Sequence, residues 1–171
     1  MAGLYQYLVE GPCEAVLLKA LMHMGQGLMP PGKVDVFNAT NELVSLTRLR
    51  TFKRETKIVL VYDTDKEGVG ILNENIARFA RYTSNELYHL QSVRNFEDEF
   101  VRACPSIRSV LDVFHTKSVA EFKSRLISHK DLPGKLESLG FDVRKMWRTK
   151  APAPFDRYAS SAETLKTVLH I

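Results

Sequence analysis

The sequence predicts an α/β fold with a mostly parallel four-stranded sheet flanked by helices and a helical C-terminal extension. Strand and helix patterns alternate over the first hundred residues, which is typical of parallel sheets with helices on both faces. The apolar run at 58–62 is long enough for a strand buried on both faces, and from residue 96 the pattern becomes helical only. We therefore predict one domain over residues 1–104 and a helical extension packed on it over residues 105–171.

Short apolar runs and helical spacings place the individual elements. Strands are expected near 4–9, 33–38, 57–62 and 86–90. Helices between the strands are expected at 13–24, from an N-cap at Thr40 or Asn41 to about 53, and at 69–82. Further helices are expected at 96–103, 107–114, 119–129, 135–140 and 162–169. Prolines make 149–154 an extended linker, and we expect Trp147, Phe155 and Tyr158 to dock this linker onto the core.

The composition is that of a globular protein, with 44% hydrophobic and 26% charged residues. No apolar run approaches the roughly 20 residues of a membrane helix. The N-terminus lacks the basic and apolar regions of a signal peptide, so we expect a cytoplasmic protein without membrane contacts. Cys13 and Cys104 lie far apart in the sequence, and we expect packing residues rather than a disulfide or a zinc site.

Carboxylates follow two of the predicted strands. Asp63 and Asp65 come at the end of the strand at 57–62, and Glu10-Gly11 follows the first strand. Positions two apart on a strand point the same way, so we expect Asp63 and Asp65 to leave the sheet as a parallel pair. Open α/β sheets place ligands at the carboxyl ends of their strands, and two close carboxylates favour a bound divalent cation.

This order of motifs resembles the Toprim domain, which topoisomerases, bacterial primases and overcoming-lysogenization-defect (OLD) nucleases share. Glu10-Gly11 matches the first family motif, and Asp63 with Asp65 matches the second. The resemblance covers roughly residues 4–100 and implies a Toprim-like Rossmannoid fold.

A third acidic segment is similar to one in OLD-type Toprim nucleases, in which a glutamate lies three residues after an arginine. Arg94 and Glu97 match this pattern, whereas Asp98 stands where those proteins usually carry an amide. The departure leaves open which carboxylate of this segment, Glu99 included, would face a metal. The alternative is that these acids only complement the dipole of a helix that begins here.

The acidic residues suit one or two Mg²⁺ or Mn²⁺ ions, which can activate water and neutralise a phosphodiester in its transition state. We expect Asp63 and Asp65 to be direct ligands, with Glu97 as a further ligand. The resemblance permits Glu10 to be a ligand or a proton-transfer group. We expect Glu14 to be a surface carboxylate, with a supporting position near the metal as the alternative.

Basic residues are the second component of such a site. OLD-type nucleases use a lysine at the scissile phosphate, and we favour Lys66 over Lys145 and Lys150 because it adjoins the acids. The net charge is +4 and the isoelectric point is near 9.1. One basic cluster comprises Arg48, Arg50, Lys53, Arg54 and Lys57, and another comprises Arg144, Lys145, Arg148, Lys150 and Arg157. Both clusters are either phosphate-steering surfaces or solvated helix faces.

Together these features predict a metal-dependent Toprim nuclease that hydrolyses phosphodiester bonds of DNA or RNA, and the OLD resemblance implies a role in antiphage defence. The alternative is a Toprim effector or regulatory subunit that acts through a partner. OLD-type modules are usually joined to an ATPase, and this chain lacks the required phosphate-binding loop. The expected partners are therefore nucleic acid, a separately encoded ATPase, or a second copy in a homodimer.

Overall fold

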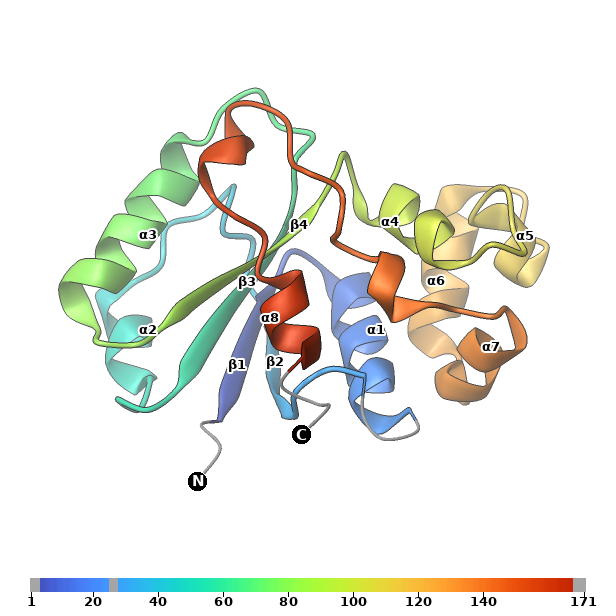
Figure 1. Cartoon of the computed structure of the whole chain (residues 1–171), viewed down its shortest axis with the longest axis horizontal. Helices are drawn as coiled ribbons and strands as arrows, with labels where there is room; N and C mark the ends of the chain where they lie inside the picture. The colour runs from blue at the N-terminus through green and yellow to red at the C-terminus, as the bar shows by residue number, and fades with distance from the viewer. Residues whose placement is uncertain (1–3, 25–27, 168–171) are drawn as a thin grey trace.

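A four-stranded, all-parallel sheet forms the centre of the molecule (Figure 1). The computed structural model describes residues 4–24 and 28–167. The strands are β1 (Tyr5–Val9), β2 (Gly32–Val36), β3 (Lys57–Asp63) and β4 (Leu87–Ser92), in the spatial order β2-β1-β3-β4. The α/β fold with a parallel, helix-flanked sheet and a C-terminal helical part is thereby confirmed.

Helices cover both faces of the sheet. The helices along the chain are α1 (Pro12–His23), α2 (Leu46–Thr51), α3 (Gly70–Tyr82), α4 (Phe96–Ala103), α5 (Leu111–Phe114), α6 (Val119–Ser128), α7 (Leu132–Ser138) and α8 (Ala162–Thr167). Two 3-10 turns are η1 (Val143–Lys145) and η2 (Phe155–Arg157). Helices α2 and α3 lie on one face, and α1 with α4–α7 lies on the other (Figure 1). The predicted end of the last helix, residues 168–169, lies outside the described residues.

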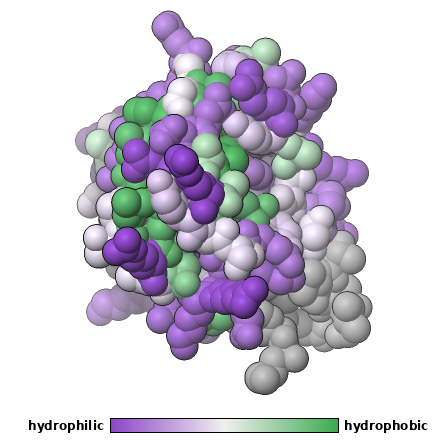
Figure 2. All heavy atoms as spheres, turned by 90° about the vertical axis from the view of Figure 1, so that its left-hand side faces the viewer, coloured by the Kyte–Doolittle hydropathy of each residue, from purple (hydrophilic) through white to green (hydrophobic). Residues whose placement is uncertain are grey.

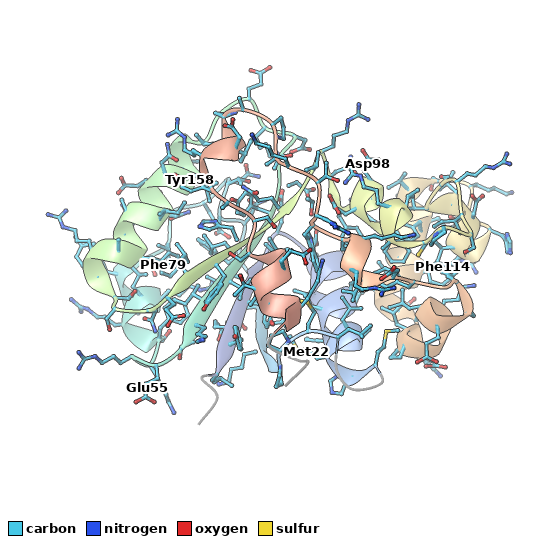
Figure 3. All side chains as sticks on the ribbon, viewed as in Figure 1. Met22, Glu55, Phe79, Asp98, Phe114 and Tyr158 are labelled. Atoms are coloured by element: carbon cyan, nitrogen blue, oxygen red, sulfur yellow. The ribbon has the colours of Figure 1, made fainter. Side chains whose placement is uncertain are left out.

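The two faces of the sheet bury two separate hydrophobic clusters. Val59 and Val61 of β3 pack toward α1, whereas Leu60 between them packs toward α2 and α3. This alternation is that of a strand buried on both sides. Phe79 lies on the inner side of α3, between this helix and the sheet (Figure 3). Asp63 continues the series of Val59 and Val61, so its side chain leaves β3 on the α1 side.

The outer side of α2 and α3 is mostly hydrophilic, with patches of apolar atoms between the charged side chains (Figure 2). Exposed apolar residues of these two helices include Leu46, Ile71 and Tyr82. None of the helices within residues 4–24 and 28–167 combines the length and apolar character needed to span a bilayer.

The C-terminal segment returns to the sheet and covers β4. Phe155 is fully buried in the cluster under α3, and Trp147 is buried in the cluster on the other face. The Ser161 amide donates to the His89 carbonyl at 2.7 Å, and the Ser161 hydroxyl accepts from the His89 amide at 3.0 Å. The ring of Tyr158 stacks on that of His89 at 5.1 Å. The aromatic residues therefore dock the linker onto the core, as predicted.

Helix α2 begins later than predicted, at Leu46 with Ser45 as its N-cap, and not at Thr40 or Asn41. The Asn38 side chain accepts hydrogen bonds from the amides of Thr40 and Asn41, both at 3.1 Å. These bonds form a turn where the sequence pattern predicts the first turn of the helix. A side chain that binds nearby backbone groups competes with helix formation.

Helices α5 and α7 also differ from their predicted bounds. Helix α5 covers only the second half of the predicted 107–114, because Asp112 accepts hydrogen bonds from the Arg108 and Ser109 amides and fixes a turn. Helix α7 begins earlier than predicted because Asp131 acts as its N-cap. Capping side chains satisfy the free amides at a helix start and so set the boundary.

Asn75 of α3 is expected to be a large contributor to stability. Its side chain is fully buried, accepts from the Val44 amide, and donates to the carbonyls of Ala39 and Glu42, all at 2.8 Å. Asn75→Ala leaves these backbone groups without their partner, and we expect the free energy of unfolding to fall by about 2–4 kcal/mol. Chemical denaturation measures this loss. In contrast, Glu74→Ala should change the free energy of unfolding by less than about 0.5 kcal/mol. Equal losses of stability in Asn75→Ala and Glu74→Ala would contradict the prediction.

Candidate functional site

A cleft of about 940 Å³ opens at the carboxyl end of β1 and β3 and extends between α4 and α6. Its acidic lining residues are Glu10, Asp63, Asp65, Glu97 and Asp98, and its basic lining residues are Arg94, Arg102, Arg108 and Lys123. Figure 3 shows Asp98 near the point where β4 passes into α4. The cleft thus brings together acids from three segments that are far apart in the sequence.

Glu10 joins the ends of neighbouring strands. It follows β1, and its carboxylate accepts from the Asp63 amide at 3.0 Å and from Asn38 Nδ2 at 2.9 Å. Adjacent parallel strands end at the same edge of the sheet, which is why Glu10 and Asp63 meet although they are 53 positions apart. Two hydrogen bonds therefore hold the Glu10 carboxylate in one orientation.

Asp63 carries the most perturbed carboxylate of the cleft. Burial, followed by the charges of Glu10 and Glu14, raises the pKa of Asp63 to about 8, while the nearby Ser92 side chain and Phe96 amide act in the opposite direction. Its Oδ1 atom is buried and has no hydrogen-bond partner among the described residues. A carboxylate in an excess of negative charge, with an unpaired oxygen, is a favourable position for a cation.

Glu14 is buried, which corrects the prediction of a surface carboxylate. Only 7% of the residue is exposed, and burial is the main cause that raises the pKa of Glu14. A Cβ atom on Gly11 would lie 3.1 Å from Glu14 Oε2, so the absence of a side chain at Gly11 makes room for this carboxylate. Its position four residues after Glu10, in the first turn of α1, was the only sequence signal of a supporting role.

Asp65 and Lys66 lie beyond the sheet. Strand β3 ends at Asp63, so Asp63 and Asp65 do not form the predicted pair of strand side chains. Asp65 is exposed and lines the cleft, whereas Lys66 is half-buried and is not among the residues described as lining it. The backbone turns after Asp63 because the Thr64 amide donates to the carbonyls of Ser92 and Arg94.

Glu97 forms an ion pair with Lys123, with 2.7 Å between Oε1 and Nζ. Burial lowers the pKa of Lys123, but the hydrogen bond and charge of Glu97, together with Cys13 and Glu14, outweigh burial and raise this pKa. Lys123 comes from α6, outside every motif identified in the sequence, and no sequence signal marked it. The C-terminal helical part therefore supplies a cation to the acidic cleft.

Glu99 has a structural role in this region. It is fully buried, and its carboxylate accepts from the Val93 amide at 3.0 Å, from the Trp147 amide at 2.8 Å and from Arg102. Asp98 is more exposed and lies 3.7 Å from Arg94. Of the three acids at the start of α4, the cleft is lined by Glu97 and Asp98.

The donor set fits Mg²⁺ or Mn²⁺ with a small number of protein ligands. Among residues 4–24 and 28–167, no three His, Cys, Asp or Glu side chains are grouped closely enough to hold a metal ion by themselves. Mg²⁺ usually retains several waters and binds one or two carboxylates together with substrate phosphates. Asp63 with its unpaired oxygen and the adjacent Glu10 provide this type of site, with Asp65 on the same cleft.

The basic clusters singled out in the sequence are separate from the cleft. None of their members is among the residues described as lining it. The cleft has its own cations, which are Arg94, Arg102, Arg108 and Lys123. Arg94 adopts a left-handed backbone conformation with φ of 70°, and its side chain is 80% exposed. These four residues are the candidates for phosphate contacts.

Comparisons with protein-family models, with curated proteins and with solved structures give no match for this chain. The resemblance to the Toprim domain stays a prediction from the three acidic motifs. A functional proposal for this protein rests on those motifs and on the acidic cleft that they form.

Proposed function

We propose that this protein is a Mg²⁺- or Mn²⁺-dependent nuclease of the Toprim type that hydrolyses phosphodiester bonds of DNA or RNA. The observation that carries the proposal is the half-buried Asp63 carboxylate, which has an unpaired oxygen and lies beside Glu10 in a cleft with basic lining residues. A role in antiphage defence is part of the proposal through the OLD resemblance alone.

Each group in the cleft has a chemical task in this reaction. A bound Mg²⁺ or Mn²⁺ would neutralise charge on the phosphate and lower the pKa of an attacking water. Asp63 and Glu10 would hold the metal together with water molecules, with Asp65 on the same cleft, and the fixed orientation of Glu10 also suits it to accept a proton. The basic lining residues would attract the phosphate backbone of the substrate.

Glu97 and Lys123 complete the proposed site. As an ion pair across α4 and α6, they place a cation close to the acids. Lys123 is a stronger candidate than Lys66 for a contact with the scissile phosphate, because Lys123 lines the cleft. Glu97 would be a metal ligand only when it leaves Lys123.

A cleavage assay on supercoiled plasmid and on structured RNA tests the proposed function. We expect cutting with Mg²⁺ or Mn²⁺ and no cutting with chelator. Glu10→Gln should reduce the rate by about 100-fold or more, because it removes a charged ligand or proton acceptor. The control is Glu67→Gln, since Glu67 is exposed and is not among the residues that line the cleft.

Binding of Mn²⁺, measured by calorimetry, separates the remaining outcomes. Metal binding without cutting would favour an effector subunit that needs a partner such as a separately encoded ATPase. Cutting that persists in chelator, or neither cutting nor metal binding, would contradict the nuclease proposal.

A further inference from the structure

The outer edge of β2 is a free sheet edge in the described structure. Strand β2 is at one end of the order β2-β1-β3-β4 and, among residues 4–24 and 28–167, pairs only with β1. Strand β4 at the other end is covered by the C-terminal segment through the bonds between His89 and Ser161. An uncovered parallel-sheet edge presents unpaired amides and carbonyls that can bind another strand.

The direction of the backbone groups of β2 follows from one hydrogen bond. The Phe37 amide donates to the Val9 carbonyl at 2.8 Å, so odd-numbered residues in this strand direct their amides and carbonyls toward β1. Backbone groups alternate in direction along a strand. Gly32, Val34 and Val36 therefore direct theirs outward, and no hydrogen bond to these groups occurs from the rest of the described chain.

The charges on β2 make this edge self-complementary. Lys33 and Asp35 are both exposed and lie two positions apart on one face of the strand. In an antiparallel pair centred on Val34, Lys33 of one copy is opposite Asp35 of the other, and the reverse pair forms by symmetry. Asp35 is already positioned by Gln6 Nε2 at 3.1 Å and by Arg48 at 3.6 Å.

The same register satisfies the outward backbone groups. With Val34 opposite Val34, Gly32 lies opposite Val36, and every one of these residues has its amide and carbonyl directed at the other copy. Gly32, Val34 and Val36 form the mutually hydrogen-bonded pairs of an antiparallel ladder. Lys33 and Asp35 occupy the non-hydrogen-bonded positions, where side chains are closest. Val36, which is 53% exposed, would cover Gly32 of the other copy.

We propose that two copies of this chain associate through their β2 edges, antiparallel about a two-fold axis at Val34, and join their sheets into one. Such an interface is isologous, since the same patch serves on both copies. The alternative use of charged residues on an edge strand is to prevent association, and edges protected in this way commonly carry lysine. The opposite charges on β2 attract a second copy in the antiparallel register instead.

Sedimentation velocity of the full chain tests the proposal with two charge variants. Lys33→Asp places two aspartates opposite each other, and Asp35→Lys places two lysines opposite each other. We expect each variant alone to dissociate at least about ten-fold more readily than the wild-type dimer. In a mixture of the two variants, each aspartate of the first chain lies opposite a lysine of the second. We therefore expect mixed dimers of near wild-type affinity.

Two further variants control for folding and for charge. Val34→Pro removes an outward amide, which an edge strand tolerates, and should give a folded monomer by circular dichroism. Lys117→Asp makes the same charge change between α5 and α6 and should leave association unchanged. A wild-type chain that sediments as a 19.5-kDa monomer would overturn the proposal. Dimers of both charge variants that are as stable as the wild-type dimer would overturn it as well.

Discussion

Asp63→Asn is expected to abolish the proposed metal-dependent cleavage and at the same time to stabilise the metal-free protein at pH 8. The loss of activity follows because the amide cannot supply the negative oxygen that the cation would bind, and we expect a decrease of at least about 1,000-fold. The gain in stability follows from the burial of Asp63 beside Glu10 and Glu14. A group that weakens the fold without metal is retained where a ligand compensates for it.

The sign of the pH effect follows from the raised pKa of Asp63. Its pKa is about 8 in the folded protein against an ordinary value of 3.8. Between these values the folded chain keeps a proton that the unfolded chain has released, so the free energy of unfolding decreases as pH rises through this window. Asn cannot ionise, and the variant should lack this decrease. At pH 8 we expect it to be more stable than the wild type by about 2–5 kcal/mol.

Urea denaturation in chelator between pH 4 and pH 9 measures this difference. Asp65→Asn is the matched control because Asp65 lines the same cleft but is exposed. It should lose activity while its stability stays within about 0.5 kcal/mol of the wild type. A wild-type profile that is flat over this pH range, or equal profiles for both variants, would contradict the burial argument.

Glu99→Ala is expected to cause the largest loss of stability. The substitution removes a fully buried carboxylate that accepts from two backbone amides and Arg102, and it leaves a cation and two amides without their partner. Breaking a buried charged pair by removing one member typically costs about 3–5 kcal/mol. Glu99→Gln keeps the size of the side chain, and its free energy of unfolding should lie between that of Glu99→Ala and that of the wild type.

Chemical denaturation and the cleavage assay together separate this structural role from catalysis. Asp98→Ala, at the preceding position of α4, should change the free energy of unfolding by less than about 0.5 kcal/mol because the ion pair of Asp98 with Arg94 is exposed. If Glu99→Ala were as stable as Asp98→Ala, the bonds of Glu99 to Val93 and Trp147 would not be contributing to the fold.

The acidic residues of the three motifs fall into two groups, those without an ion pair and those that form one. Among the described residues Asp63 and Glu10 form no ion pair, whereas Glu97 and Glu99 are paired with Lys123 and Arg102. Unpaired buried charge is costly and is therefore informative about function, while paired charge serves both folding and chemistry.

Local sequence patterns were sufficient to predict the four strands, although β2 ends at Val36 rather than near residue 38 and β4 at Ser92 rather than near residue 90. The apolar run before Asp63 and the alternation of strands with helices follow from periodicity, and they place Glu10 and Asp63 at one edge of a parallel sheet. The start of α2 was predicted wrongly, because Asn38 and Asn75 hold the preceding loop through contacts that no periodic pattern records.

The environment of these acids depends instead on tertiary packing. The burial of Glu14 depends on how α1 packs against its neighbours, and the pairing of Glu97 with Lys123 depends on where α6 docks on α4. Contacts between helices distant in the sequence are set by the packing of whole elements rather than by the spacing of residues within one. Local patterns therefore predict that Glu10 and Asp63 lie at one edge of the sheet, whereas the raised pKa of Asp63 and the partners of the acids arise from packing.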